Sequence, residues 1–366
     1  MNDISSLLLI GVGGAGCSMV RSVIGAFGAS IRHLLVDTDA TTGIADGVFS
    51  LIGGNRLSGR GAGGDIVAAR LAAAESVQTL DESIGSARLA VVVTALGGGT
   101  GGGGTLELLR HLKKRGIPTV VFATTPFAFE GENRLRNARN VMAMIEETAN
   151  ATFFLPLDTL VAGIDNMDEA LRSAIDTVAT GVTFFWRMLE KPGYIRLSVE
   201  NLRHLIAGAG RGRFATFSVE GPDRASRAVE AIARSPLLAT GTAPVKTILC
   251  GLLAGSDLRL SEIGEIAEGA RNAYGKHCTF ELATVNDEAT FSGRLVIVIL
   301  LLESSAREDQ AAEHADDKSG GRHRQKSALA APTSGRGRFQ QAQPTVWHGE
   351  DLDIPTFIRE CIQLDF

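Results

Sequence analysis

A run of seven glycines around one threonine is the part of the sequence best suited to chemistry. Residues 97–104 read GGGTGGGG and lie between an apolar, β-branched stretch ending near Val93 and a helical pattern with Leu106, Leu109 and Leu112. Because glycine has no side chain, successive backbone N–H groups can approach an anion, and the N-terminus of the following helix adds partial positive charge. The pattern indicates a phosphate-binding loop. A flexible linker is the alternative, but linkers rarely join a buried strand to a helix.

Two further glycine-rich segments lie beside predicted strands. Residues 6–27 contain a GxGxxG pattern between a strand and a helix, and SGRGAGGD at residues 58–65 precedes a helix expected over 66–78. Loops that leave parallel strands at their carboxyl ends meet at one edge of the sheet. The three segments therefore predict one shared site for a triphosphate.

Asp37 opens an alternative interpretation. It ends a predicted strand about 20 residues after Gly16, where a dinucleotide-binding unit places the acid that binds its ribose. An NAD-dependent oxidoreductase therefore fits the first fifty residues. The long glycine loop at 97–104, which a dinucleotide fold does not require, argues against it.

Length and composition limit the classes of function. A chain of 366 residues suggests about two domains, and a net charge of −5 spread along the chain lacks the basic footprint of a nucleic-acid-binding domain. The longest apolar run, residues 295–302, is too short to cross a membrane, and the first residues lack the basic start of a signal peptide. We expect a cytoplasmic protein with neither a nucleic-acid partner nor a membrane span.

The string GGGTGGG at residues 97–103 resembles the signature loop of tubulins, and its setting resembles that of FtsZ, the bacterial tubulin relative that polymerises at the division site. Residues 11–18, 37–40 and 61–65 resemble the earlier nucleotide loops of that family, in the same order. The run PFAFEGENR, which begins at Pro126, is similar to the ribose-side loop. The resemblance implies bound GTP or GDP, with Mg²⁺.

The resemblance assigns nucleotide-binding positions one by one. From the first three loops they are Gly13, Gly14, Ala15, Cys17, Ser18, Asp37, Ala62, Gly63 and Gly64. The signature loop contributes Gly97, Gly98, Gly99, Thr100, Gly101 and Gly102, and the ribose-side loop contributes Pro126, Glu130 and Arg134. A carboxylate such as Glu130 suits a sugar hydroxyl, and Arg134 suits negative charge. Asp37 replaces an Asn of the family pattern, and Mg²⁺ would offset its charge beside the phosphates.

A long helix is predicted over residues 168–189, with its apolar residues on one stripe. The resemblance implies a core helix that joins two domains and holds guanine in its early turns. Asp176 matches the family's acid, which accepts hydrogen bonds from guanine N1–H and the 2-amino group. Ile175 stands in place of the adjacent amide and Leu171 in place of the stacking aromatic, so we expect a weakened preference for guanine.

The segment KPGYIRLSVENLRHLI follows at the spacing of the FtsZ loop that reaches the nucleotide of the next subunit. That loop carries an Asn and two Asp, and the catalytic positions here are Arg196, Ser198 and Asn201. Neither Ser nor Asn accepts a proton at neutral pH, and losing a general base typically removes about 10²- to 10⁴-fold of rate. Glu200 lies about 100° around the helix from Asn201 and is a poor substitute. We expect slow GTP hydrolysis.

The predicted fold is α/β and tubulin/FtsZ-like, organised about the core helix. We expect a Rossmann-like, parallel-sheet GTP-binding domain at residues 1–166, the core helix at 167–190, a smaller α/β polymerisation domain at 191–303, a disordered linker at 304–350 and an adaptor-binding peptide at 351–366. In the last segment Ile354, Phe357 and Ile358 share a helical face. It resembles the peptide by which FtsZ engages its membrane-tethering adaptors.

The function that follows is an FtsZ-like protein of bacterial cell division. It would assemble head to tail into cytoskeletal filaments, because a heterologous contact of this kind does not close, and act in septation at the division site. A hydrolysis-deficient paralogue that co-assembles with or regulates a second, active FtsZ is the alternative within the family. The NAD-dependent oxidoreductase is the alternative outside it.

Overall fold

The computed structural model describes residues 3–27, 31–43, 49–207, 209–239, 243–275 and 278–303, together with 346–347 and 350–351. The chain divides into two units, residues 1–312 and 313–366. In the second unit, β11 (Val346–Trp347) pairs antiparallel with β12 (Glu350–Asp351). The predictions for the linker and the C-terminal peptide otherwise concern residues outside the described ranges.

One mixed sheet runs through the described part of the first unit. Its strands are β1 (Leu7–Val12), β2 (His33–Asp37), β3 (Phe49–Leu51), β4 (Leu89–Ala95), β5 (Thr119–Thr125), β6 (Ala151–Pro156), β7 (Gly210–Glu220), β8 (Val245–Ala254), β9 (Thr279–Asn286) and β10 (Arg294–Glu303). Their order is β3-β2-β1-β4-β5-β6-β7-β10-β8-β9. Strands β3 to β7 in that order are parallel, β10 is antiparallel to β7 and β8, and β9 is parallel to β8. The sheet confirms the predicted α/β fold.

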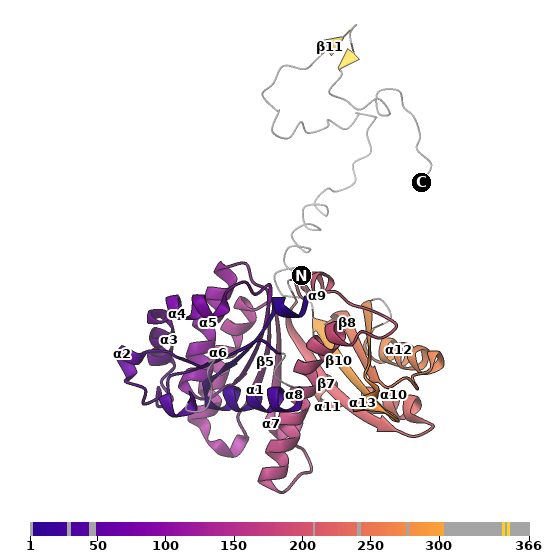
Figure 1. Cartoon of the computed structure of the whole chain (residues 1–366), viewed down its shortest axis with the longest axis horizontal. Coiled ribbons are helices and arrows are strands. Elements are labelled where there is room, and N and C mark those ends of the chain that lie inside the picture. Colours follow the sequence, from indigo (N-terminus) through magenta and orange to yellow (C-terminus); the bar gives the residue numbers. More distant parts are fainter. Residues whose placement is uncertain are drawn as a thin grey trace, which may run out of the picture. The chain divides into compact units, whose positions relative to one another are not determined.

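Helices cover the sheet (Figure 1). They are α1 (Gly13–Phe27), α2 (Gly54–Leu57), α3 (Ile66–Glu75), α4 (Val77–Ile84), α5 (Thr105–Lys114), α6 (Glu132–Thr148), α7 (Leu157–Leu160), α8 (Met167–Glu190), α9 (Val199–Ile206), α10 (Arg224–Arg234), α11 (Pro236–Ala239), α12 (Leu260–Tyr274) and α13 (Glu288–Phe291). Short 3₁₀ turns occur at Asp3–Ser6, Ala40–Gly43 and Ala128–Glu130, and a π turn at Thr100–Gly104 precedes α5.

The apolar strands are explained by burial on both faces of the parallel sheet. In β4, Val91 and Val93 pack in the core that contains α1 and α8, whereas Ala90 and Val92 pack in the core beneath α4, α5 and α6. Parallel sheets with helices on both faces require such continuous apolar strands. The carboxyl ends of these strands are thereby fixed at one edge of the sheet.

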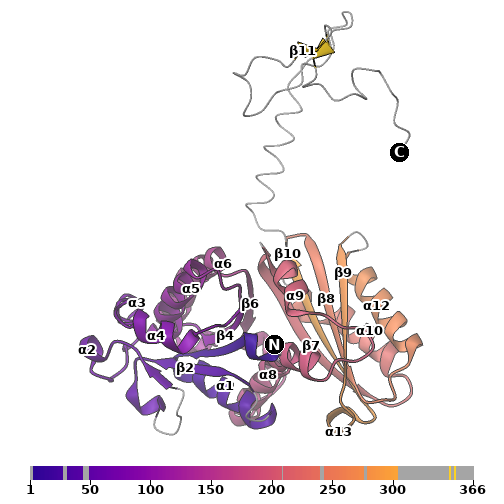
Figure 2. The same cartoon turned by 45° about the horizontal axis from the view of Figure 1, so that its top comes forward.

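Helix α8 lies between the two halves of the sheet (Figure 2). Its Phe185 ring meets Phe122 of β5 at 6.2 Å, and Phe122 meets Phe214 of β7 at 5.1 Å, all within one buried core. Gly181 lets the helix approach, since a β-carbon there would lie 2.3 Å from the Phe214 ring. A separate core forms where α10 and α12 cover β7, β8 and β10. The helix expected over 168–189 is present as Met167–Glu190.

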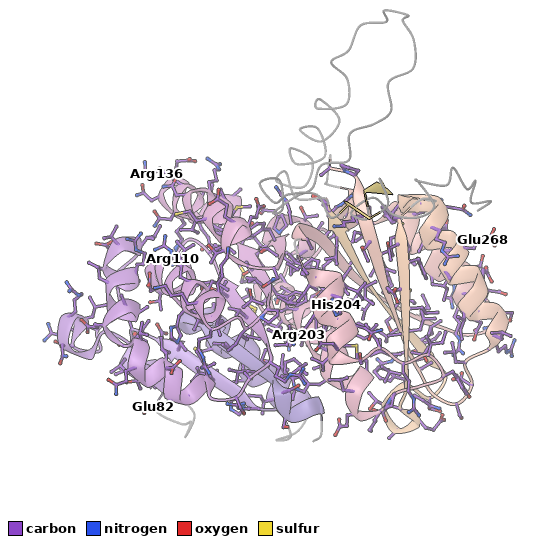
Figure 3. All side chains as sticks on the ribbon, turned by 90° about the horizontal axis from the view of Figure 1, so that it is seen from above. Glu82, Arg110, Arg136, Arg203, His204 and Glu268 are labelled. Atoms are coloured by element: carbon purple, nitrogen blue, oxygen red, sulfur yellow. The ribbon has the colours of Figure 1, made fainter. Side chains whose placement is uncertain are left out.

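The outer faces of the helices carry charge. Glu82 of α4, Arg136 of α6 and Glu268 of α12 project away from the sheet (Figure 3). Among the described residues, no helix combines the length and the apolar character needed to span a membrane.

Candidate functional site

The strand order has its switch point at β1 and β4, and open parallel sheets form a crevice beyond the carboxyl ends of the strands at such a point. The chain leaves β1 toward β2 and β3 on one side, and β4 is followed by β5 and β6 on the other. Ligands of open parallel sheets bind outside the carboxyl ends of the strands at such a switch point. The first glycine segment follows β1 and the signature loop follows β4, so both lie at this crevice.

Three loops meet at Thr38, the residue after β2. Its carbonyl oxygen accepts a hydrogen bond from Gly61 N at 3.1 Å, and its hydroxyl lies 2.7 Å from the hydroxyl of Thr100. The first loop joins the same group, because a β-carbon on Gly13 would lie 3.1 Å from Gly101 N. The convergence expected from the glycine-rich segments is therefore present in the fold.

Buried hydroxyl groups fix the signature loop to the end of β4. Thr94 Oγ1 donates to the Gly101 carbonyl oxygen at 3.0 Å and lies 3.2 Å from Thr105 Oγ1, the donor at the start of α5. These groups are fully buried, where a satisfied polar network specifies one arrangement of the backbone. Thr94 and Thr105 were not among the positions chosen from the sequence.

The glycines of the site divide into two groups. A β-carbon on Gly101 would lie 2.1 Å from the Ala95 carbonyl oxygen, and one on Gly103 would lie 2.0 Å from that of Ile66. These glycines are required by close packing of backbone on backbone. A β-carbon on Gly98 would instead meet nothing within 4 Å, and the same holds for the neighbouring loop, residues 63–64.

The open glycines border a cavity of about 380 Å³. It is lined by Gly63, Gly64, Gly97, Gly98, Asn133, Arg134 and Asn137. Asn137 holds its wall together, since Nδ2 donates to the carbonyl oxygens of Gly64 at 3.1 Å and Gly97 at 3.3 Å. Sequence reasoning missed Asn133 and Asn137; the available signal was that Asn137 follows Arg134 by three residues and shares its side of α6.

A second cavity, of about 420 Å³, lies beside the first and shares Arg134 with it. The loop after β5 lines one side, and Leu171 and Ile175 of α8 line another. Glu130 Oε1 accepts from Phe127 N at 2.9 Å, and its other oxygen forms an ion pair with Arg134. The guanidinium group of Arg134 is thereby anchored at the junction of the two cavities.

The positions predicted to bind nucleotide fall into distinct places. Those lining the larger cavity are Ala15, Ser18, Pro126, Glu130, Arg134, Leu171 and Ile175, and those lining the smaller one are Gly63, Gly64, Gly97 and Gly98. Gly13, Gly99, Thr100, Gly101 and Gly102 are buried where the loops pack, Ala62 packs against Gly99, and Gly14 is exposed near Asp37.

Besides Ala62 and Thr100, three more of the predicted side chains line neither cavity. The thiol of Cys17 is fully buried and lies 3.5 Å from the Gly11 carbonyl oxygen, facing the sheet. Asp37 is 4% exposed, and its carboxylate accepts from Thr38 N at 2.7 Å and from the Thr42 hydroxyl at 2.8 Å. Asp176 is exposed and lines a separate surface depression beside α8.

The loop with the predicted catalytic positions lies at the opposite end of the sheet. Ser198 caps α9: its Oγ accepts from Asn201 N at 3.1 Å and donates to Asn201 Oδ1 at 2.6 Å, while Arg196 is exposed. Glu200 pairs with Arg88 at 3.1 Å, and Arg88 immediately precedes β4. The three converging glycine-rich loops, which we call the glycine cradle, lie beyond the carboxyl end of β4. The loop at 196–201 therefore cannot act on the cradle of its own chain.

Comparison with known proteins agrees with this geometry. Residues 6–165 match the family model described as Tubulin/FtsZ family, GTPase domain, and this span includes all three glycine-rich segments. This part of the chain is similar to the GTPase domain of the tubulin/FtsZ family. Because the match extends through the signature loop, it favours the GTPase interpretation of the first fifty residues over the dinucleotide-binding one.

Relatives span nearly the whole chain. The cell division protein FtsZ of Pseudomonas aeruginosa is 28% identical over 357 residues, covering 96% of this chain and 88% of that protein. An FtsZ dimer structure from M. jannaschii superposes with a TM-score of 0.75 at 23% identity, over 81% of this chain and 87% of that one. CetZ2 of Haloferax volcanii gives 0.67 at 22% identity, over 86% and 99%. The two structures show a shared tubulin/FtsZ fold.

Proposed function

We propose that this chain is an FtsZ-like GTP-binding protein that assembles head to tail into filaments during bacterial cell division and hydrolyses GTP slowly. The main supporting observation is the arrangement about β4. Three glycine-rich loops and Arg134 surround the crevice at its carboxyl end, and the loop of residues 193–203 lies at its other end.

The residues present fit a nucleoside triphosphate. Gly98 and the loop at 63–64 have free space where a side chain would be, so their backbone can approach phosphate oxygens closely. Arg134 supplies positive charge between the two cavities, each of which has the volume of a small-molecule site. Glu130 retains lone pairs for a sugar hydroxyl besides those used by Phe127 and Arg134.

We propose that Mg²⁺ binds with the triphosphate. Among the described residues no group of three or more His, Cys, Asp or Glu side chains could hold a metal. Mg²⁺ typically uses one or two carboxylates together with substrate phosphates, so it does not require such a cluster. Asp37 is a candidate carboxylate beside the first glycine loop, because its Oδ2 would lie 3.7 Å from a β-carbon on Gly14.

Head-to-tail assembly follows from the positions of the two surfaces. The seven residues of β4 separate them by about 20 Å at the usual rise per residue. A second copy stacked along this direction would bring its 193–203 loop to the cradle of the first, and such a contact repeats without closing. Two structural neighbours are themselves assemblies, an FtsZ dimer and a GTPγS-bound CetZ2 protofilament, which supports assembly of this chain.

Slow hydrolysis follows from the loop's hydrogen bonds. The incoming loop would present Ser198 and Asn201, but the Ser198 hydroxyl is already used to cap α9 and to bond Asn201 Oδ1. The remaining amide N–H groups of Asn201 can orient a water molecule but cannot take its proton. Glu200 is engaged by Arg88 and Arg203, each at 3.1 Å. The same facts favour a second candidate function, a paralogue that joins or regulates filaments of an active FtsZ.

The proposal is tested by binding and assembly measurements on the full chain. Calorimetric titration should detect GTP binding with little or no binding of NAD, and light scattering should rise on addition of GTP with Mg²⁺. NAD binding without GTP binding would overturn the proposal. GTP binding without a rise in scattering, followed by a rise when a second FtsZ is added, would favour the co-assembling paralogue.

We also propose that residues 351–366 dock a membrane-tethering division adaptor. The support is the sequence spacing of Ile354, Phe357 and Ile358, which would share one face if the segment became helical on docking. Deleting this segment should leave GTP-dependent scattering unchanged and abolish localisation at the division site in cells. Unchanged localisation of the truncated protein would contradict this docking role.

A further inference from the structure

The larger cavity is polar at one end and apolar at the other. Its charged groups, Glu130 and Arg134, lie at the end shared with the glycine cradle. The rest of the wall is mainly apolar and includes Phe127, Phe129, Leu157, Met167, Leu171 and Ile175. If the triphosphate occupies the cradle, as proposed above, the base must lie against this apolar wall.

Three apolar side chains at the rim are unusually exposed. Phe129 is 69% exposed, Met167 is 47% and Leu171 is 41%. Phe129 also stacks on Phe127 with ring centroids 4.9 Å apart, which presents a flat aromatic surface at the cavity. Exposed apolar groups gathered at one site mark a surface that a ligand or partner covers. A planar purine ring matches this surface in shape and in polarity.

Helix α8 offers no hydrogen-bonding side chain to this wall. Leu171, Ala174 and Ile175 line the cavity, at the three- and four-residue spacing of one helix face. Asp176 lies about 100° further around the helix. It is exposed and lines the separate depression that also contains Ser173 and Thr216.

Strong discrimination between guanine and adenine requires a hydrogen-bonding side chain that faces the base. Guanine presents N1–H and a 2-amino group as donors, which a carboxylate accepts and which adenine lacks. A site built to bond those donors can reject the wrong base by about 10⁴-fold or more. An apolar wall typically discriminates by about 10- to 200-fold between two ligands that differ by one methylene group. Here both purines have nearly the same shape, so shape adds little.

We infer that this site binds purine nucleoside triphosphates with little preference between guanine and adenine, so that the dissociation constants of GTP and ATP lie within about tenfold of each other. The glycine cradle and Arg134 grip the triphosphate equally in the two nucleotides. The apolar wall and the Phe127–Phe129 pair hold the purine by contact area. This inference rests on the proposed nucleotide binding at the same cavity.

The experiment measures GTP, ATP and CTP binding to the full chain by calorimetry in the presence of Mg²⁺. GTP and ATP should bind within tenfold of each other, and CTP should bind more weakly because its smaller base covers less of the wall. A GTP-to-ATP preference above tenfold overturns the inference and leaves nucleotide binding intact. Failure of all three nucleotides to bind overturns the proposed function itself, together with the inference.

Two substitutions on α8 test the geometry. Asp176→Asn should leave the GTP-to-ATP ratio within twofold of the parent value, since this side chain faces away from the cavity. Ile175→Asn introduces an amide into the wall and should shift the ratio toward GTP by at least threefold. Ser173→Ala, in the same depression as Asp176, is the matched control and should behave like the parent. If Asp176→Asn loses GTP binding but keeps ATP binding, while Ser173→Ala keeps both, the inference is overturned.

Discussion

The hydroxyl oxygens of Thr38 and Thr100 lie 2.7 Å apart, although 62 residues separate them in the sequence. Thr38 is fully buried and Thr100 is 8% exposed. This hydrogen bond joins the loop after β2 to the signature loop after β4, and the Thr38 carbonyl oxygen joins both to Gly61. The shape of the cradle therefore depends on a polar contact between loops that are distant in sequence.

Replacing Thr100 by Val should loosen the cradle while preserving its volume. The Thr38 hydroxyl would lose its partner at a buried position, and a buried unsatisfied hydroxyl costs about 1–3 kcal/mol. We expect the free energy of unfolding to fall by that amount in urea denaturation and GTP affinity to fall several-fold in calorimetry. Thr100→Ser keeps the hydroxyl and should bind GTP like the parent. Equal GTP affinity for Thr100→Val and the parent would contradict a role of this bond in the cradle.

The fold was largely predictable because its signals are local. The apolar runs that become β4 and β10, and the periodic stripe that becomes α8, report burial directly. One boundary was wrong: the helix expected over 66–78 ends at Glu75, and α4 begins separately at Val77. Ser76 explains the break, because its hydroxyl bonds the Gly53 backbone and the Ala72 carbonyl oxygen.

The site was less predictable because part of it depends on contacts between loops. Glycine can be read as a phosphate ligand, but the sequence does not distinguish Gly98, which faces open space, from Gly103, which packs on Ile66. Asn137 was missed because its role is to bridge two backbone carbonyl groups from different loops. The direction of Asp176 depends on how α8 is rotated against the sheet, which a motif match does not report.

Gly98 and Gly103 form a matched pair that separates binding from packing. In Gly98→Ala the methyl group enters the smaller cavity without a clash, so thermal stability should stay near the parent value while GTP affinity falls at least tenfold. In Gly103→Ala the methyl group would lie 2.0 Å from the Ile66 carbonyl oxygen, so the protein should be strongly destabilised or fail to fold. Thermal denaturation and GTP calorimetry on both variants test this. Undiminished GTP binding by Gly98→Ala would mean that the phosphates do not lie in this cavity.

Restoring acids to the loop at 196–201 should accelerate hydrolysis. Asp is as good an N-cap as Ser, and Asp at the third position of α9 complements the helix dipole, so Ser198→Asp with Asn201→Asp should preserve the fold. A carboxylate that accepts the proton of the attacking water should raise the phosphate-release rate by about 10²-fold or more at saturating protein. Equal turnover of the parent and the double variant would contradict the assignment of slow hydrolysis to these two positions.

Glu200→Gln is the control for that experiment. The Glu200 carboxylate pairs with Arg88 and Arg203 and is half exposed, so it is neither free nor directed by burial toward a bound water. Phosphate release should change by less than twofold in this variant. A large loss of rate would mean that Glu200, and not the positions beside it, supplies the missing base.

Arg224 should be essential for the stability of the region where α10 packs on α12. Its side chain is 5% exposed and bonds Glu262 at 2.7 and 2.9 Å and Asp257 at 2.6 Å. The bonds from Arg224 lower the pKa of Glu262, so the pair is charged at neutral pH. Arg224→Met leaves two carboxylates without their cation and should lower the free energy of unfolding by about 3–5 kcal/mol. The exposed pair Arg234–Glu230 is the control, and Arg234→Ala should cost at most about 1 kcal/mol in the same urea titration.

Asp287 fastens the end of α8 to the loop after β9. Its carboxylate is 3% exposed and accepts from Arg187 at 2.7 Å and from Lys191 at 2.8 Å. The adjoining segment is held as well, since Gly193 N donates to the Thr284 carbonyl oxygen at 2.8 Å. The Asp287 contacts therefore position the start of the loop that we propose to reach the next subunit.

This clamp predicts a defined pH dependence. Burial by itself raises the pKa of Asp287, but hydrogen bonds from Lys191 and Thr290 and the charges of Lys191 and Arg187 outweigh it, so the pKa is lowered. A carboxylate with a lowered folded-state pKa contributes stability that is fully present above its unfolded pKa of about 3.9 and is lost as the pH falls through the folded value. Asp287→Asn should lower the free energy of unfolding by about 1.5–3 kcal/mol at pH 7, and this difference from the parent should shrink below about pH 4.

Urea titrations of the parent and Asp287→Asn at a series of pH values from 7 to 3 measure that difference. Glu132→Gln removes an exposed ion pair with Arg139 and serves as the control, with unfolding free energies that follow the parent at every pH. Because the clamp holds the segment leading to the 193–203 loop, Asp287→Asn should also reduce GTP-dependent light scattering at pH 7 without changing GTP affinity. A stability difference that grows as the pH falls would mean that the folded-state pKa of Asp287 is raised and not lowered, and the ion-paired clamp would then be wrong.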